Sequence, residues 1–96
     1  MIYKIAEFKI KREYLERAKQ AIREFVEAVK TEPGTEIYSS YQKEDELSFI
    51  HFMAFKDKQA EDFHRQTPHV KKFVSVLYPL CDYEPRFTEL RLLWEK

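Results

Sequence analysis

The spacing of apolar residues switches repeatedly between two periods along this chain, and the order of the switches limits what it can fold into. From Ile2 to Ile10, apolar and other residues alternate with a period of two, which predicts a strand. From Glu13 to Val29 the apolar residues recur every three or four positions, which predicts an amphipathic helix. Glu36–Lys43 and Leu47–Lys56 then predict two strands joined by a charged hairpin loop.

Helix signals mark the remaining boundaries. The segment Glu32-Pro33-Gly34-Thr35 ends the first helix, and its glycine, the only one in the chain, is expected to form a left-handed turn. Asp57 is placed to cap a short helix that runs through His64. Thr67-Pro68 gives a second capping signal, so a kinked pair of helices is expected. Phe87–Trp94 is predicted to be the last strand.

This order, βαββαβ, is that of the ferredoxin-like α+β fold. Residues 1–96 are expected to form one domain, a four-stranded antiparallel sheet with both helical segments on one face, because βαβ crossovers are right-handed. The other face should then alternate toward polar residues, yet it carries Tyr3, Ile5, Ile50, Phe52 and Leu90. An uncovered apolar face of this size predicts a homodimer in which two sheets meet and form an α+β barrel.

Composition excludes several classes of function. Seventeen basic and seventeen acidic residues cancel, so no net field would attract nucleic acid. The start of the chain lacks the pattern of a secretion signal, no apolar run is long enough to cross a membrane, and the lone Cys81 has no disulfide partner; a cytoplasmic protein is expected. Metal-ligand spacings and glycine-rich phosphate loops are also missing, so neither a metal nor a cofactor is predicted.

The middle of the chain resembles a known family. Glu32–Thr35 leads into a tyrosine-bearing strand, Phe49–Phe55 and Lys56–Ala60 follow, and the segment His64-Arg65-Gln66-Thr67-Pro68-His69 comes next. Together these segments resemble the antibiotic biosynthesis monooxygenase (ABM-like) domains of the dimeric α+β barrel superfamily. The resemblance implies a homodimer with a small-molecule pocket between sheet and helices. Its characterised members include cofactor-independent monooxygenases of aromatic compounds, haem-degrading enzymes and an isomerase.

The chain also departs from this family. Members commonly carry a glutamate near the end of the third strand, where this chain has Met53 and Phe55. The haem-degrading branch uses an Asn, Trp and His set, whereas this chain has no asparagine and its one tryptophan, Trp94, lies in the predicted last strand. Three functions therefore remain open: a cofactor-independent monooxygenase of phenols or quinols, a non-catalytic sensor or carrier, and an isomerase-type enzyme.

Cofactor-free oxygenation requires a base beside an apolar pocket, and histidine is the natural choice near neutral pH. We predict His64 as this base, because it follows Ala60 by one turn and should face the boundary between helix and sheet; the alternative is that it only bonds a backbone carbonyl or tightens the kink before Pro68. His51 is either a polar group of the pocket or a satisfied core residue, and His69 either contacts ligand or serves as a capping or surface residue. The other candidate ligand contacts are the aromatic side chains Tyr41, Phe55 and Phe63.

Overall fold

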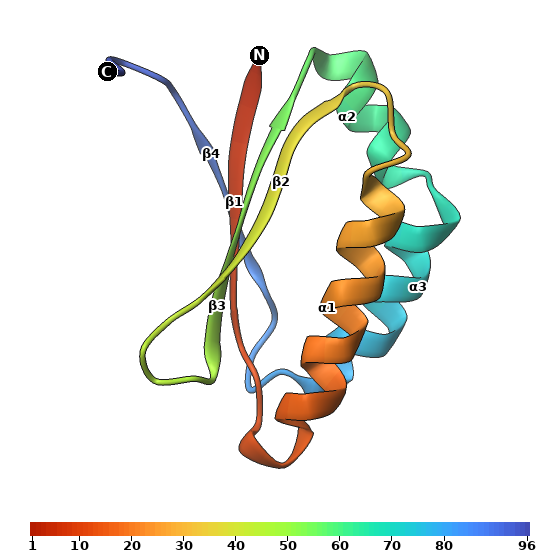
Figure 1. The fold of residues 1–96 in the computed structure, drawn as a ribbon, viewed down its shortest axis with the longest axis vertical. Coiled ribbons are helices and arrows are strands. Elements are labelled where there is room, and N and C mark those ends of the chain that lie inside the picture. The colour runs from red at the N-terminus through yellow and green to blue at the C-terminus, as the bar shows by residue number, and fades with distance from the viewer.

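A computed structural model describes all 96 residues, and its elements follow the predicted order (Figure 1). The elements are β1 (Ile2–Lys9), α1 (Leu15–Val29), β2 (Thr35–Gln42), β3 (Ser48–Phe55), α2 (Lys58–Arg65), α3 (Pro68–Leu77) and β4 (Arg86–Leu90), with short 3-10 turns at Arg12–Tyr14 and Tyr78–Leu80. The ferredoxin-like α+β fold is thereby confirmed.

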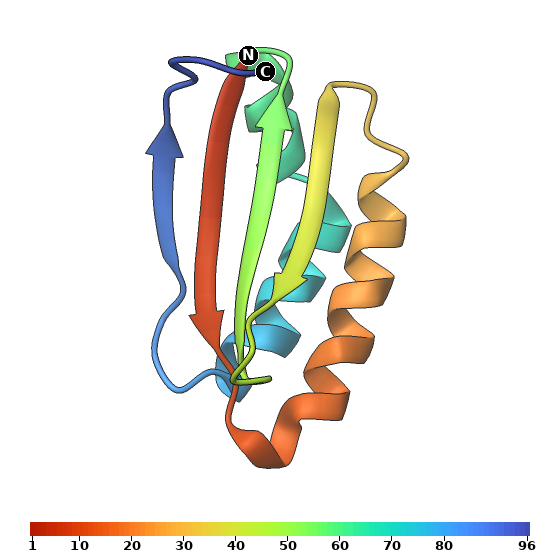
Figure 2. The same ribbon diagram turned by 60° about the vertical axis from the view of Figure 1, so that its left-hand side comes forward.

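The four strands form one antiparallel sheet in the order β2-β3-β1-β4. All the helices lie on one side of it, with α1 and α3 side by side across the sheet and α2 at one end (Figures 1 and 2). Strands β1 and β3 pair along their full length, from Ile2 opposite Phe55 to Lys9 opposite Ser48. The sheet therefore has a helix-covered face and an open face.

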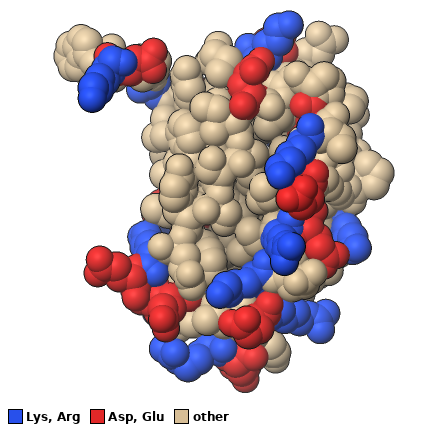
Figure 3. Space-filling model, viewed as in Figure 1, with Lys and Arg blue, Asp and Glu red and all other residues tan.

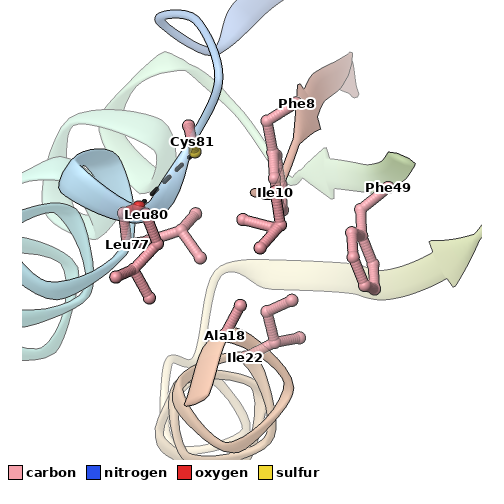
Figure 4. Packing of buried hydrophobic residues seen from close by; sticks show 8 residues of the cluster. All are labelled: Phe8, Ile10, Ala18, Ile22, Phe49, Leu77, Leu80 and Cys81. Carbon is pink, nitrogen blue, oxygen red and sulfur yellow. Dashed lines mark hydrogen bonds between the residues drawn. The ribbon is translucent and has the colours of Figure 1, made fainter. Parts of the chain in front are cut away.

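Alternation along the central strands builds the core on the helix-covered face. The largest cluster joins side chains of β1, β3, α1 and the end of α3, among them Phe8, Ile22, Phe49 and Leu77 (Figure 4). Cys81 belongs to this cluster, with its thiol directed at the carbonyl of Leu77 at 3.4 Å. Burial raises the pKa of this thiol to about 11, so it packs as a small apolar group.

Capping fixes the two shorter helices where they were predicted. The carboxylate of Asp57 accepts a hydrogen bond from the backbone N–H of Ala60, and the hydroxyl of Thr67 accepts one from Val70, with Pro68 as the first helical residue. Helix α2 is also held to the sheet by a buried ion pair between Glu61 and Lys4 of β1, at 2.5 Å. The two caps and the ion pair together position α2 over the end of β3.

The last strand is shorter than predicted. Strand β4 ends at Leu90, which lies opposite Tyr3, and the segment from Arg91 to Lys96 has no regular structure. Beyond Leu90 the chain makes no further pairing with β1, so the apolar alternation of this segment does not continue the strand. This C-terminal segment leaves the body of the molecule on the side away from the helices (Figure 1).

No helix of the structure has the length and apolar character that crossing a bilayer needs.

Gly34 does not adopt the left-handed conformation expected for it. The one residue with positive φ is Glu46, at 67°, in the loop between β2 and β3. Gly34 is instead required by close packing, because a Cβ atom built on it would lie 2.4 Å from the Cβ of Ala60 in α2. The bend before β2 and the first turn of α2 therefore touch through a glycine.

We expect Gly34→Ala to lower the free energy of unfolding by roughly 1–3 kcal/mol, the usual cost of overpacking. Urea unfolding measures this directly. Ala60→Gly removes the atom that the new methyl group would meet, so the double variant should be more stable than the sum of the two single losses implies. Strictly additive losses would show that the contact is not the cause.

Candidate functional site

A small cavity lies between the helix-covered face of the sheet and the helices. Its volume is about 70 Å³, and most of its wall is apolar, including Phe8, Met53, Phe73 and Leu77. Four polar side chains also line it: Tyr38 from β2, His51 from β3, His64 from α2 and Tyr78 from the 3-10 turn after α3. The cavity thus combines an apolar wall with a few convergent polar groups, as small-molecule sites usually do.

A buried carboxylate stands beside this cavity. Glu32, in the turn after α1, accepts hydrogen bonds on one oxygen from His64 Nδ1 at 2.8 Å and from the Thr35 hydroxyl at 2.6 Å, and its other oxygen is bonded to His69 Nε2. Its side chain is almost fully buried. Burial alone would raise the pKa of Glu32, but the hydrogen bonds from Thr35, His69 and His64 outweigh it and lower the pKa. Glu32 is therefore ionised at neutral pH.

Glu32 determines which nitrogen of His64 is free. Burial lowers the pKa of His64 more than the neighbouring carboxylate raises it, so the imidazole is neutral at pH 7. An ionised carboxylate can only accept, so we assign the single ring proton to Nδ1. Nε2 then carries a lone pair and makes no hydrogen bond with any protein group, on a ring that lines the cavity. This is the arrangement of a general base held by a carboxylate.

Tyr38 and His51 form a second polar pair in the wall. The Tyr38 oxygen lies 2.8 Å from His51 Nδ1. Burial, helped by the charge of Glu32, raises the pKa of Tyr38, and burial lowers the pKa of His51 to about 4, so both groups are neutral. We assign the phenol as donor to Nδ1, which leaves the second proton of the pair on His51 Nε2. That nitrogen is buried without any partner, as a donor awaiting a ligand oxygen would be.

The structure brings only some of the predicted residues to this cavity. His64 and His51 line it, and Phe55 lies behind His64 with its ring centroid 5.1 Å away. His69 is outside the cavity and is joined to it through Glu32. Tyr41 lies on the open face of the sheet, opposite Ile50, and Phe63 points outward from α2; neither contacts the cavity.

Glu32 was not singled out in the sequence, where its position before Pro33-Gly34 indicated only a turn. A carboxylate that faces two histidines, 32 and 37 positions further along the chain, leaves no local pattern. The structure shows no group of three or more His, Cys, Asp or Glu side chains arranged to hold a metal ion.

The buried histidines make stability depend on pH. Because the pKa of His51 is about 4 in the folded protein and 6.5 as its ordinary value, the unfolded chain binds a proton in this interval that the folded protein does not. Stability should therefore be fully present above pH 6.5 and fall by roughly 3 kcal/mol between pH 6.5 and 4 on account of His51. His64 and Glu32, whose pKa values are also lowered, add losses in the same direction.

The variant His51→Asn isolates this contribution, because asparagine places an acceptor near the position of Nδ1 for Tyr38 and does not titrate. Urea unfolding from pH 4 to 7 should show a lower maximum stability for His51→Asn and a shallower decline with acid. Parallel curves for the two proteins would contradict the assignment of this loss to His51.

Known proteins resemble this chain in sequence and in fold. A family model described as antibiotic biosynthesis monooxygenase matches residues 1–76. The uncharacterized protein sll1783 of Synechocystis sp. is 41% identical over 51 residues, a stretch that covers 52% of this chain and 35% of that protein. The chain thus spans about a third of the length of this curated relative.

Solved structures extend the likeness to nearly the whole chain. A crystal structure of an antibiotic biosynthesis monooxygenase superposes with a TM-score of 0.92 at 22% identity, covering 97% of this chain and 99% of that one. The Rv0793 protein of Mycobacterium tuberculosis gives 0.90 at 21%, covering 98% and 96%. A conserved protein of Methanosarcina mazei gives 0.88 at 22%, covering 94% and 90%. At these identities the structures establish a shared fold, and the family match covers most of the chain; this protein belongs to the antibiotic biosynthesis monooxygenase family.

Proposed function

We propose that this protein is a cofactor-independent monooxygenase of small phenolic or quinol compounds, working in the cytoplasm. The observation that carries the proposal is His64: a neutral imidazole, held through Nδ1 by a buried carboxylate, with Nε2 unbonded beside an apolar cavity. A base in this setting can remove the proton of a phenol, and the resulting phenolate is rich enough in electrons to reduce O2 without a cofactor.

The reaction balances with the substrate as the source of all the electrons. His64 Nε2 takes the hydroxyl proton, a ring carbon of the phenolate forms a C–O bond with O2, and a hydroperoxide results. Loss of the ring hydrogen and cleavage of the O–O bond then leave one oxygen as a quinone carbonyl. The other oxygen leaves as hydroxide and takes up the ring proton to become water; the proton that His64 removed from the hydroxyl was returned when the hydroperoxide formed. His51 Nε2–H would donate to an oxygen of the substrate during these steps.

A non-catalytic sensor or carrier would use the same cavity for binding alone, and an isomerase would use the same base without O2. An oxygen electrode with a panel of simple phenols and hydroquinones separates these functions. Uptake of one O2 for each quinone formed, without release of hydrogen peroxide, supports the proposal. Binding that raises the melting temperature without O2 uptake supports the sensor or carrier. Conversion of a compound at the same rate with and without air supports the isomerase.

We also propose that the protein acts as a homodimer joined through the open face of the sheet. Tyr3, Ile5, Ile50 and Phe52 lie on this face in neighbouring strands, with Tyr3 and Phe52 stacked 6.3 Å apart. In the space-filling view, Lys, Arg, Asp and Glu gather over the helices and the lower end, while the upper part of the sheet side is largely uncharged (Figure 3). A second copy is the occupant that matches a self-complementary apolar sheet.

A further inference from the structure

A second hollow lies on the outside of the helical layer, in the groove between α1 and α3. Its volume is about 260 Å³, and its floor is apolar, with the small side chains Ala21 and Ala28 contributed by α1. Three polar side chains also line it: His69 and Lys72 of α3 and Glu24 of α1. On the α1 side the groove is thus lined by two small residues, Ala21 and Ala28, and by the larger Glu24 and Phe25.

Two aromatic rings separate this groove from the inner cavity. Phe25 of α1 and Phe73 of α3 line both hollows, and their rings are stacked 4.2 Å apart and nearly parallel, at 6°. Phe25 also lies 6.0 Å from the ring of His64 on the inner side and 6.0 Å from that of His69 on the outer side. The barrier between the groove and the base is therefore one pair of side chains, the Phe25–Phe73 pair.

The inner cavity is too small to hold an aromatic ring alone. A dry cavity that holds benzene measures about 150 Å³, twice the inner cavity, and pockets for small molecules usually begin near 300 Å³. The inner cavity and the groove together reach that range. Rotation of the Phe25–Phe73 pair would join them, since side-chain rotations require no change of the backbone.

We propose that the ligand site continues past the Phe25–Phe73 pair into the α1–α3 groove, and that the groove is the route by which the phenolic substrate enters. Its hydroxyl reaches His64 and His51, its rings replace the contact between Phe25 and Phe73, and its far end lies beside His69 and Lys72. The ammonium group of Lys72 can donate hydrogen bonds, which favours a substrate with a carbonyl or acidic group at that end; Nε2 of His69 is already bonded to Glu32. The phenolic nature of the ligand rests on the proposed function; the route rests on the two hollows.

Stopped-flow binding of 2-naphthol, a fluorescent bicyclic phenol, tests the route. Ala28→Trp and Ala21→Trp each fill the groove from the exposed side of α1, and both should lower the association rate constant at least tenfold. Gln20→Trp adds the same side chain to the same helix outside the groove and should stay within twofold of the unaltered protein. Circular dichroism checks that each variant is folded.

Unaltered association in both groove variants would overturn the route, and so would failure of the unaltered protein to bind 2-naphthol. Retarded binding in the groove variants, with no O2 taken up on any phenol, would leave the route standing and remove the monooxygenase. Equal retardation in Gln20→Trp would also count against the groove, because the effect would then not depend on filling it.

Discussion

His64→Asn should lower the rate of O2 uptake with a phenolic substrate by at least 100-fold, the scale of losing a general base. Asparagine can still donate an N–H to Glu32 from a position near that of Nδ1, so the local hydrogen bond is kept. What disappears is the Nε2 lone pair that lines the cavity. The measurement is initial O2 consumption at saturating substrate, beside urea unfolding to confirm that the variant is folded.

Glu32→Gln supplies the companion test, because it keeps the size of the side chain and removes its charge. The carboxylate raises the pKa of His64, so its loss should move the acid limb of the pH–rate profile to lower pH as well as reduce the rate. If Glu32 were only structural, its replacement would lower stability without moving that limb.

An unchanged rate in His64→Asn would show that His64 takes no part in the chemistry.

Local sequence patterns predicted most of the fold. The features that they did not predict depend on contacts between segments distant in the sequence. Periodicity and capping signals correctly placed most strands, helix α1 and the caps at Asp57 and Thr67. Each of these features depends on residues that are a few positions apart. The end of β4 could not be read in this way, since it depends on pairing with β1, a strand distant in the sequence. Gly34 was misread for a similar reason: its constraint is Ala60, which belongs to another helix.

The same distinction between local patterns and distant contacts applies to the residues of the site. His64 was predicted at the boundary between helix and sheet, and it lies there, because helical spacing fixes which way a side chain points. Its partner Glu32 and the Tyr38–His51 pair depend on how three elements meet, which no spacing encodes. Tyr41 and Phe63 were predicted as ligand contacts from their aromatic character, and they lie outside the cavity. Aromatic character alone does not say which surface a residue faces.

The second large effect concerns assembly: Tyr41→Lys and Phe52→Lys should convert a homodimer into a monomer of 11.7 kDa. Both side chains lie on the open face, Phe52 on the central strand β3 and Tyr41 on the edge strand β2. Docking of two sheets would strip water from an introduced ammonium group with no carboxylate opposite it, which costs several kcal/mol. Light scattering of dilute protein measures the mass.

Phe63→Lys is the matched control, because Phe63 is 55% exposed and Tyr41 58% exposed, but Phe63 projects from α2 on the other side of the molecule. The Phe63→Lys variant should remain dimeric.

The C-terminal segment offers the proposed interface a further apolar side chain. Trp94 is 88% exposed, and the segment stands clear of the body of its own chain (Figure 3), where a second sheet could contact it.

A stable folded monomer for the unaltered protein would contradict the homodimer, and the open face would then need another partner. Dissociation by Phe63→Lys alone, with Tyr41→Lys still dimeric, would move the interface to the helical side. Because the base, its carboxylate and the cavity all lie on the helix-covered face, a monomer made by Tyr41→Lys should still bind 2-naphthol. Binding lost together with the dimer would mean that the partner completes the site.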